Sequence, residues 1–223
     1  MIRYFNDVID RFREHSDLKK VLGIVARLES QTQKSIRVVF DIGAGSGHKA
    51  SILARSFPKA VLYCFEPDPI TFEHLKKRMA TFGGRVNCYN LGFYNTNDKI
   101  DFFPGNPSDT VPGSFLPEKS RRPIRAVSRR LDDFMKEQGI GPVDFMKISA
   151  GGVERELLEG GRDTLLRTEN LFIEIFPALN GIHSHNYIEA TELIHQSGFS
   201  LFGVYGGFFF TKLIRDKEYS MLK

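Results

Sequence analysis

The stretch VVFDIGAGSG, residues 38–47, decides how this 223-residue chain folds. An apolar, β-branched run ends on Asp41, and glycines follow at alternate positions before a segment with helical spacing begins at His48. Glycine lets the backbone adopt positive φ values and lets a ligand approach closely, while the free N–H groups of a helix start favour polar or anionic ligand atoms. The stretch therefore predicts a strand, a tight ligand-binding turn and a helix.

Two classes of ligand bind at such turns, dinucleotides and S-adenosylmethionine (SAM). A dinucleotide fingerprint has the spacing Gly-x-Gly-x-x-Gly, whereas this chain has Gly-x-Gly-x-Gly. The charge of Asp41 would repel a pyrophosphate but suits the ammonium and sulfonium groups of SAM. A second acid, Glu66, ends the next apolar run, where it could accept hydrogen bonds from both hydroxyls of a ribose. The combined pattern favours SAM over an ordinary turn with two solvated carboxylates.

The composition indicates one globular protein with a single substantial core. Hydrophobic residues make up 41% of the chain and charged residues 26%, and no apolar run approaches the roughly 18 residues that a membrane span needs. No secretory signal follows Met1, and Cys64 and Cys88 lie in apolar runs, as free thiols do. We therefore expect a cytoplasmic protein without a membrane span.

The net charge of +4 is mild. It is compatible with an anionic acceptor or with a membrane surface, whereas a nucleic-acid binder usually concentrates more basic charge on one face. We therefore expect a small-molecule or glycan partner and no nucleic acid. The sequence leaves both a monomer and a homodimer open.

Alternating strand and helix patterns predict a parallel sheet with helices on both faces. Residues 1–35 show the spacing of two amphipathic helices and form an N-terminal helical segment ahead of one domain over residues 36–223. Two runs at 200–204 and 208–214, joined across a pair of glycines, predict an antiparallel hairpin. Strands are expected at 36–41, 61–66, 86–91, 143–148 and 171–176, and helices at 48–57, 69–82, 131–138, 154–166 and 186–198.

The segment 104–123 is expected to be a long loop between short strands at 100–103 and 124–127. It contains five prolines, which exclude a regular helix or a central strand. A loop of this length within a compact domain is often a functional lid. A disordered surface insertion is the alternative.

Six short motifs in a fixed order carry a closer resemblance: VFDIGAGSG (39–47), FEPDP (65–69), LDDF (131–134), VDFMKI (143–148), ELLEGG (156–161) and FIEI (172–175). Together they resemble the FkbM family of methyltransferases. The resemblance implies an α/β, Rossmann-like class I methyltransferase fold, with a mostly parallel seven-stranded sheet that ends in an antiparallel hairpin and has helices on both faces. It also implies SAM as the methyl donor and O-methylation of a hydroxyl on a sugar, glycan or small secondary metabolite.

The resemblance also assigns residues to the cofactor. The glycine turn would hold SAM, the acid after the second strand would bind its ribose, and the turn after the third strand would lie near its adenine. These residues are Asp41, Gly43, Ala44, Gly45, Gly47, Glu66, Pro67, Asn90, Gly92 and Phe93.

One motif departs from the family pattern. Where the family commonly continues its fourth strand as Lys-Ile-Asp-Val-Glu-Gly, residues 147–152 read Lys-Ile-Ser-Ala-Gly-Gly, so Ser149 and Gly151 replace both acids. An acid at that strand end could position the acceptor, take its proton or ligate a metal. Without it a hard cation loses an expected oxygen ligand, so no metal is expected.

The base of the reaction must then lie elsewhere, unless methyl transfer runs with little help from a base or the chain has lost activity. The candidates are His183 and His185 after the fifth strand, Glu174 on that strand, and Ser149. Their ordinary alternatives are solvated loop histidines and a carboxylate paired with Lys or Arg. A catalytically impaired, methyltransferase-like binding or scaffold protein therefore remains an alternative, and a nicotinamide-dependent oxidoreductase is a third, disfavoured by the glycine spacing.

Overall fold

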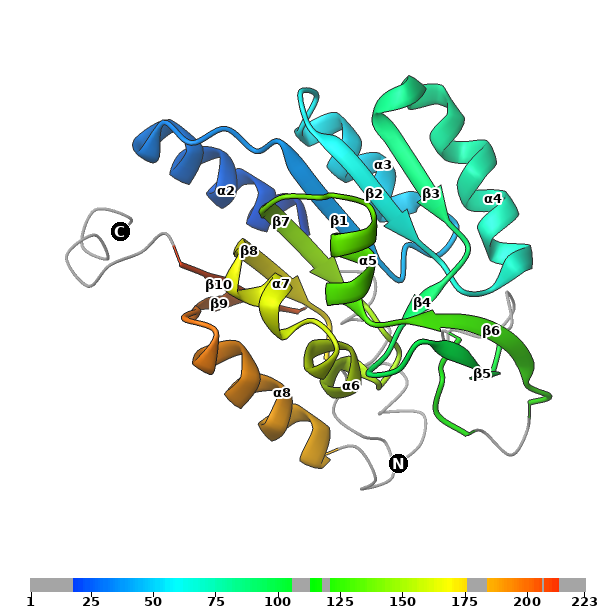
Figure 1. Cartoon of the computed structure of the whole chain (residues 1–223). Helices are drawn as coiled ribbons and strands as arrows, with labels where there is room; N and C mark the ends of the chain where they lie inside the picture. Colours follow the sequence, from blue (N-terminus) through cyan, green and yellow to red (C-terminus); the bar gives the residue numbers. More distant parts are fainter. Residues whose placement is uncertain (1–17, 106–112, 118–120, 176–183, 206, 213–223) are drawn as a thin grey trace, which may run out of the picture.

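The central sheet lies at the middle of the molecule. The structure is a computed structural model that describes residues 18–105, 113–117, 121–175, 184–205 and 207–212, with the backbone alone for 184–187. Within these residues the sheet consists of β1 (Val38–Ile42), β2 (Val61–Phe65), β3 (Val86–Tyr89), β7 (Val143–Ile148), β8 (Thr168–Ile173), β9 (Ser200–Val204) and β10 (Phe208–Thr211). Their order in space is β3-β2-β1-β7-β8-β10-β9 (Figure 1).

Five neighbouring strands of this sheet run parallel, and the last two form a hairpin. β3, β2, β1, β7 and β8 pair in parallel, whereas β10 pairs antiparallel with both β8 and β9. The expected mostly parallel, seven-stranded sheet with a terminal antiparallel hairpin is confirmed. The strand order reverses between β1 and β7, and open α/β sheets bind their ligands at the carboxyl ends of strands beside such a reversal.

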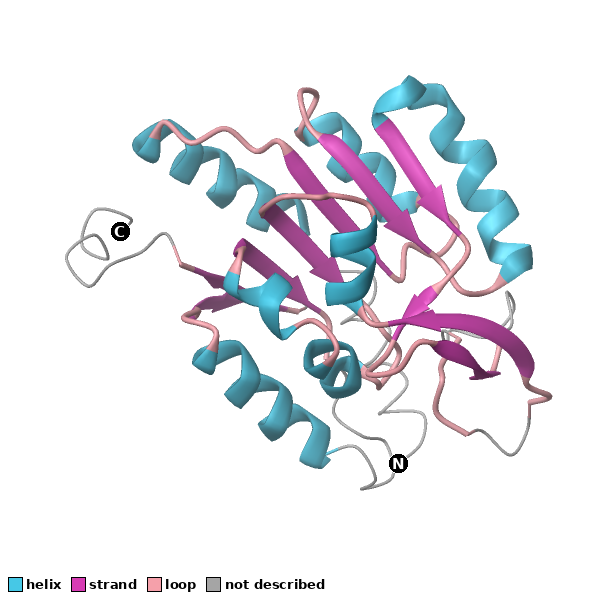
Figure 2. Cartoon of the chain, viewed as in Figure 1, coloured by secondary structure: helices cyan, strands magenta, loops and turns pink. Residues whose placement is uncertain are grey.

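Helices cover both faces of the sheet, as predicted (Figure 2). On one face lie α2 (Leu18–Thr32), α3 (His48–Ser56) and α4 (Pro69–Met79). On the other lie α5 (Leu131–Glu137), α6 (Glu154–Glu159), α7 (Arg162–Leu166) and α8 (Ser184–Gln196). Two separate apolar clusters, one for each face, fill the space between helices and sheet because alternate strand residues point to opposite faces.

The helix starts and stops follow local chemistry. The Asp68 side chain accepts the N–H of Ile70 (2.9 Å), and Pro69 occupies the first position of α4, as the sequence predicted. The buried stripe of α2 packs into the same apolar cluster as α3 and β1. The first of the two predicted N-terminal helices lies outside the described residues.

Several boundaries differ from the prediction by a few residues. The fifth strand begins at Thr168 and ends at Ile173 rather than spanning 171–176, because polar residues at its start find partners inside the fold; Asn170, for example, donates to the carbonyl oxygen of Asp144 (2.9 Å). The helix expected at 186 begins at Ser184. The helix expected to reach 82 ends at Met79 and continues as the 3-10 helix η1 (Ala80–Arg85).

A second, three-stranded sheet stands beside the first. It contains β4 (Gly92–Phe93), β5 (Asp98–Phe102) and β6 (Ile124–Arg129) in the order β4-β6-β5. The short strands predicted on either side of the 104–123 loop therefore pair with each other, antiparallel, so that Phe102 lies opposite Ile124. This small sheet carries the long loop.

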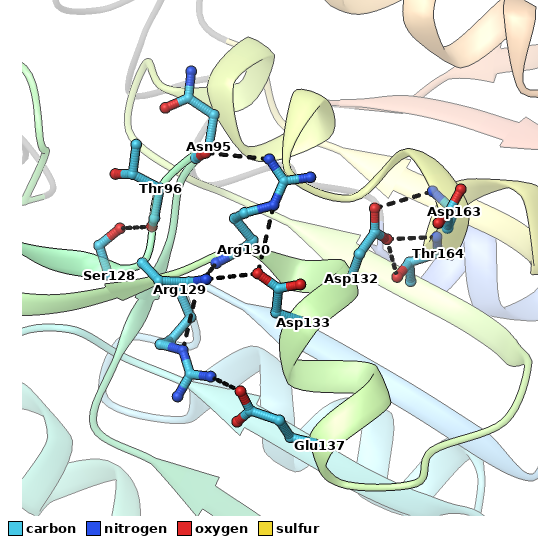
Figure 3. A network of polar contacts seen from close by, with 11 residues as sticks. Asn95, Thr96, Ser128, Arg129, Arg130, Asp132, Asp133, Glu137, Asp163 and Thr164 are labelled. Atoms are coloured by element: carbon cyan, nitrogen blue, oxygen red, sulfur yellow. Dashed lines mark hydrogen bonds and ion pairs between the residues drawn. The ribbon is translucent and has the colours of Figure 1, made fainter.

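The LDDF motif fastens the small sheet to the helices (Figure 3). Asp132 accepts the backbone N–H and the hydroxyl of Thr164 (2.8 and 2.7 Å), which caps the start of α7. Asp133 accepts a hydrogen bond from Asn97 (2.6 Å) and forms an ion pair with Arg130 (3.6 Å). The two acids of this motif therefore have structural roles, at a distance from the glycine turn.

Candidate functional site

The glycine turn between β1 and α3 is held against the end of β2. Gly43 and Ala44 donate their backbone N–H groups to the carbonyl oxygen of Phe65 (3.0 and 2.9 Å), and Gly45 donates to Glu66 Oε2 (2.9 Å). The turn of the first strand and the acid of the second therefore form one hydrogen-bonded unit.

The three glycines of the turn have positive φ values, at +69°, +56° and +87°, but their surroundings differ. A Cβ atom on Gly43 would lie 2.0 Å from the carbonyl oxygen of Ser149, and one on Gly47 would lie 2.9 Å from Leu75 Cδ1. A Cβ atom on Gly45 would meet no atom within 4 Å. Gly43 and Gly47 are thus required by the fold itself, whereas Gly45 faces open space that a ligand can enter.

Glu66 lies at the carboxyl end of β2 and is 7% exposed. Its Oε2 accepts the N–H of Gly45, and its Oε1 accepts the N–H of Asp68 (3.0 Å). Burial raises the pKa of Glu66 to about 7, although both backbone hydrogen bonds favour the ionised form. Because a carboxylate offers about four acceptor positions, each oxygen can still accept from a further donor, such as a hydroxyl.

The turn after β3 borders the same place. Asn90 Nδ2 donates to the carbonyl oxygens of Glu66 and Pro67 (2.8 and 3.1 Å), which ties the ends of β2 and β3 together. The ring of Phe93 is 2% exposed and packs edge-on against Phe65, with 4.7 Å between centroids. Of the residues predicted near adenine, Phe93 can therefore offer a ligand its backbone but not its ring.

Asp41 is fully buried and paired with Lys147. Lys147 Nζ lies 3.0 Å from Asp41 Oδ1 and donates to the carbonyl oxygens of Gly43 (2.8 Å) and Ile42 (3.5 Å). Burial raises the pKa of the Asp41 carboxyl, and Lys147 opposes that rise. Burial also lowers the pKa of Lys147, but Asp41 and Glu174 outweigh it and leave that pKa raised.

The ammonium group that Asp41 faces in this structure therefore belongs to the protein. Through Lys147, Asp41 holds the glycine turn, and a direct contact with SAM stays a prediction. Sequence reasoning quoted Lys147 within a motif but gave it no role. The available signal was a lysine in a strand otherwise read as buried, since such a lysine needs a charged partner.

A second ion pair lies nearby. Glu174 directly follows β8 and is 4% exposed, and its Oε1 forms an ion pair with Lys49 Nζ from the first turn of α3. Burial and the charge of Lys147 lower the pKa of Lys49, although Glu174 opposes this. Asp41, Lys147, Glu174 and Lys49 thus form one cluster of alternating charge at the carboxyl ends of β1, β7 and β8. Sequence reasoning missed Lys49, since no local pattern pairs two residues so far apart.

The altered motif forms a compact turn after β7. Ser149 donates its backbone N–H to the carbonyl oxygen of Ile42 (3.0 Å), so the turn is joined to β1. Glu154 is 1% exposed, and its Oε1 accepts the N–H groups of Ala150 (3.2 Å) and Gly152 (3.1 Å). Burial raises the pKa of Glu154 to about 7.

Residues 113–117 of the long loop, here called the strap, contact this turn. They also contact Gly92, one of the residues predicted to bind the cofactor. Ser114 Oγ donates to the carbonyl oxygen of Gly151 (2.5 Å). A Cβ atom on Gly151 would lie 2.5 Å from the carbonyl oxygen of Gly113. A Cβ atom on Gly92 would likewise lie 2.5 Å from the ring of Phe115. The strap therefore takes the room that a side chain at position 151 would need, so the family acid does not fit there in this arrangement.

Neither of the two histidine candidates has a side chain among the described residues. His183 lies outside these residues, and His185 lies in α8 where the backbone alone is described. A role for either in catalysis stays a prediction. His48, next to the glycine turn, is exposed and lies with its Nε2 3.2 Å from Arg78 Nη2.

Within the described ranges, two features are absent: a metal-binding cluster and a membrane-spanning helix. No group of three or more His, Cys, Asp and Glu side chains is placed there to hold a metal ion. None of the helices found there is both long and apolar enough to cross a membrane.

Comparison with known proteins settles the family. The family model for the methyltransferase FkbM domain matches residues 41–201. The chain belongs to the FkbM family of methyltransferases. A family relative, the 2-O-methyltransferase NoeI of Sinorhizobium fredii, is 30% identical over 174 residues, which cover 71% of this chain and 70% of NoeI. The hexuronic acid methyltransferase AglP of Haloferax volcanii is 24% identical over 195 residues, which cover 87% of this chain and 74% of AglP.

Solved structures agree on the fold. A structure from Clostridium thermocellum, proposed to be an rRNA methylase, has a TM-score of 0.50 and 10% identity, and the match covers 84% of this chain and 92% of that one. Membership of the FkbM family confirms the Rossmann-like methyltransferase fold predicted from the motifs. It also sets aside the nicotinamide-dependent oxidoreductase.

Proposed function

We propose that this FkbM methyltransferase transfers a methyl group from SAM to a hydroxyl of a sugar or glycan. The observation that carries the proposal is the joined glycine turn and acid: Gly45 faces open space while its N–H holds Glu66 at the edge of that space. The printed names of two relatives, a 2-O-methyltransferase and a hexuronic acid methyltransferase, support the acceptor class. The cytoplasmic location and the choice between monomer and homodimer stay predictions.

The cofactor would be held by the residues that meet at the ends of β1, β2 and β3. Glu66 would accept hydrogen bonds from the ribose hydroxyls, and Gly45 would give the backbone clearance beside it. Pro67, Asn90 and Gly92 would border the adenine. When bound, SAM supplies a methyl group on a cationic sulfonium, which a hydroxyl oxygen can attack in line.

The acceptor would meet the cluster of alternating charge. Glu174 can accept the proton of the attacking hydroxyl at its carboxylate, and the ion pair with Lys49 orients that carboxylate. Ser149 can hydrogen-bond the acceptor, since it stands at the end of β7 beside the glycine turn. Positioning of the hydroxyl supplies most of the rate in such a displacement, so the lost acids do not by themselves abolish the reaction. His183 and His185 stay alternative bases.

A catalytically impaired binding or scaffold protein is the second candidate. It is favoured by one observation, the occupation of the space at Gly151 by the strap, where the family usually has an acid. This candidate predicts that the protein binds SAM, or binds neither SAM nor an acceptor, and that in both cases it shows no turnover.

The test combines calorimetric titration with a transfer assay. We expect SAM and S-adenosylhomocysteine to bind the wild type, and Glu66→Ala to abolish binding while its circular dichroism stays unchanged. With a panel of sugar acceptors, release of S-adenosylhomocysteine should fall at least tenfold in Glu174→Gln without a change in SAM affinity. Binding without turnover on every acceptor would favour the scaffold, and no binding of SAM by the folded protein would overturn the proposal.

A further inference from the structure

The charge of the chain is divided between the two faces of the sheet. Helices α2, α3 and α4 together carry eight Lys and Arg residues and two Glu residues. Helices α5 to α8 carry three Lys and Arg residues and nine Asp and Glu residues. Because these sets cover opposite faces (Figure 1), the mild net charge conceals one strongly basic face.

A groove of about 700 Å³ opens on that basic face, between α3 and α4. α3 contributes His48 and Arg55 to its lining, and α4 contributes His74, Lys77 and Arg78. None of the lining residues is a carboxylate. Three permanent cations and two imidazoles therefore surround one hollow.

The cations of the groove are not neutralised by carboxylates within the part of the chain that the structure describes. No salt bridge joins Arg55, Lys77 or Arg78 to a carboxylate of the described chain. The neighbouring Lys76, by contrast, pairs with Glu73 (3.3 Å) and does not line the groove. Unpaired cations gathered in one place repel each other, and an anion bound among them removes that cost.

The groove is also fixed in shape. Arg78 donates its Nε to the carbonyl oxygen of Ser46 (2.8 Å) in the glycine turn, and its Nη2 lies 3.2 Å from His48 Nε2. Arg55 stacks over the ring of Phe82, with 5.7 Å from the guanidinium carbon to the ring centroid. Both guanidinium groups thus have partners within the protein before any ligand arrives, which lowers the entropic cost of binding.

We propose that this groove is a second binding site, separate from the methyl-transfer site, and that it binds the phosphate groups of a soluble phosphorylated molecule such as a nucleoside diphosphate. Arginine presents paired donors that match phosphate oxygens, and lysine and histidine add point charges. A diphosphate carries enough negative charge to pair with more than one of the three cations. An open hollow that gathers these cations from two helices offers a small molecule several charged partners at once.

The experiment is a titration of the full chain with inorganic pyrophosphate in a phosphate-free buffer of low ionic strength. Lys77→Gln and Arg55→Gln should each weaken binding by about tenfold, because each removes a charged partner. Lys76→Gln is the matched control, since it removes the same charge one residue away, outside the groove. It should change the affinity less than twofold.

Each outcome decides the proposal. Equal weakening by Lys76→Gln and Lys77→Gln would mean diffuse attraction and would overturn the site, as would the absence of binding at millimolar pyrophosphate. Binding to phosphatidic acid vesicles or to single-stranded RNA, with no binding of pyrophosphate, would replace the soluble ligand with a lipid or nucleic-acid partner. Titration with SAM in parallel keeps this result distinct from the cofactor site, because Lys77 and Arg55 touch none of its residues.

Discussion

Lys147 Nζ lies 3.0 Å from Asp41 Oδ1 and 2.8 Å from the carbonyl oxygen of Gly43, so one buried ammonium group joins β1, β7 and the glycine turn. Asp41 and Lys147 are side by side because they are register partners on neighbouring parallel strands. The acid that begins the motif and the lysine more than a hundred residues later are therefore one structural unit.

Removal of either charge should destabilise the protein strongly. Asp41→Ala removes the carboxylate that pairs with the buried Lys147 ammonium, and Lys147→Met leaves the Asp41 carboxylate buried without its partner. Each change should cost about 3 to 5 kcal/mol in the free energy of unfolding. The double variant Asp41→Ala/Lys147→Met should cost clearly less than the two single changes together. Urea unfolding measures all three. Lys34→Ala, which breaks an exposed pair with Glu169, is the control and should cost less than about 1 kcal/mol. Additive costs would contradict the pairing.

The affinity for SAM should rise with pH around neutrality. Burial raises the pKa of Glu66 to about 7, and the ionised carboxylate is the form that accepts from hydroxyls on both oxygens. The ionised fraction grows about tenfold between pH 6 and pH 8, and the affinity should follow it. Glu66→Gln should bind more weakly and lose this pH dependence. Because SAM itself titrates identically with both proteins, the difference between the two calorimetric profiles reports Glu66. Parallel profiles would refute its role.

Glu154 should make the protein less stable as pH rises. Its pKa is raised from 4.5 in the unfolded chain to about 7 in the folded one, so the folded state holds the proton more tightly. The free energy of unfolding therefore falls as pH rises from about 4.5 through 7, by about 2 to 3 kcal/mol. Glu154→Gln keeps the oxygen that accepts from Ala150 and Gly152 but cannot ionise. Relative to wild type, its stability in urea should improve from pH 5 to pH 8, and a constant difference would disprove the effect.

Gly45→Ala should separate ligand binding from folding. Its Cβ atom meets no protein atom within 4 Å, so the stability cost is only that of a non-glycine residue at positive φ, about 1 kcal/mol. The control is Gly139→Ala. Gly139 lies just after α5, has a φ value of +61°, and a Cβ atom on it would also meet no atom within 4 Å. Both variants should melt alike, while Gly45→Ala alone should lose affinity for SAM. Equal affinity in the two variants would show that the ligand does not approach Gly45.

Gly151→Ala should release the strap. Here the added Cβ atom would lie 2.5 Å from the carbonyl oxygen of Gly113, so the variant bears a steric clash beyond the cost of its φ value. We expect faster proteolysis within the 104–123 segment and a loss of stability larger than that of Gly139→Ala. Ser114→Ala removes the hydrogen bond to Gly151 without a clash and should give a smaller effect in the same direction. Unchanged proteolysis in both variants would mean that the strap is not held there.

The sequence predicted the sheet, its hairpin and the glycine turn because these depend on local patterns. Alternating strands and helices imply a parallel sheet whatever the side-chain detail, and the strand-turn-helix at residues 38–48 is continuous in the chain. The same patterns gave Glu66 its place at a strand end.

The missed features are contacts between distant segments. The ion pair of Lys49 with Glu174 and the contact of Phe115 with Gly92 join residues from separate elements, and no periodicity encodes them. The loss of the acid at position 151 was visible in the sequence, but its reason was not. The backbone of Gly113, which occupies the room for a side chain at that position, comes from a loop that pattern reasoning could describe only as long and rich in proline.

The pairing of Phe102 with Ile124 closes the stem of the 104–123 segment before the segment begins. Asp133 fastens this stem to α5 through Asn97, apart from the contacts that the strap makes with Gly92 and Gly151. Lengthening a closed loop costs little free energy. Grafting the corresponding stretch from another family member onto this stem, with Gly92 and Gly151 kept for the strap, therefore tests whether the segment sets the acceptor range.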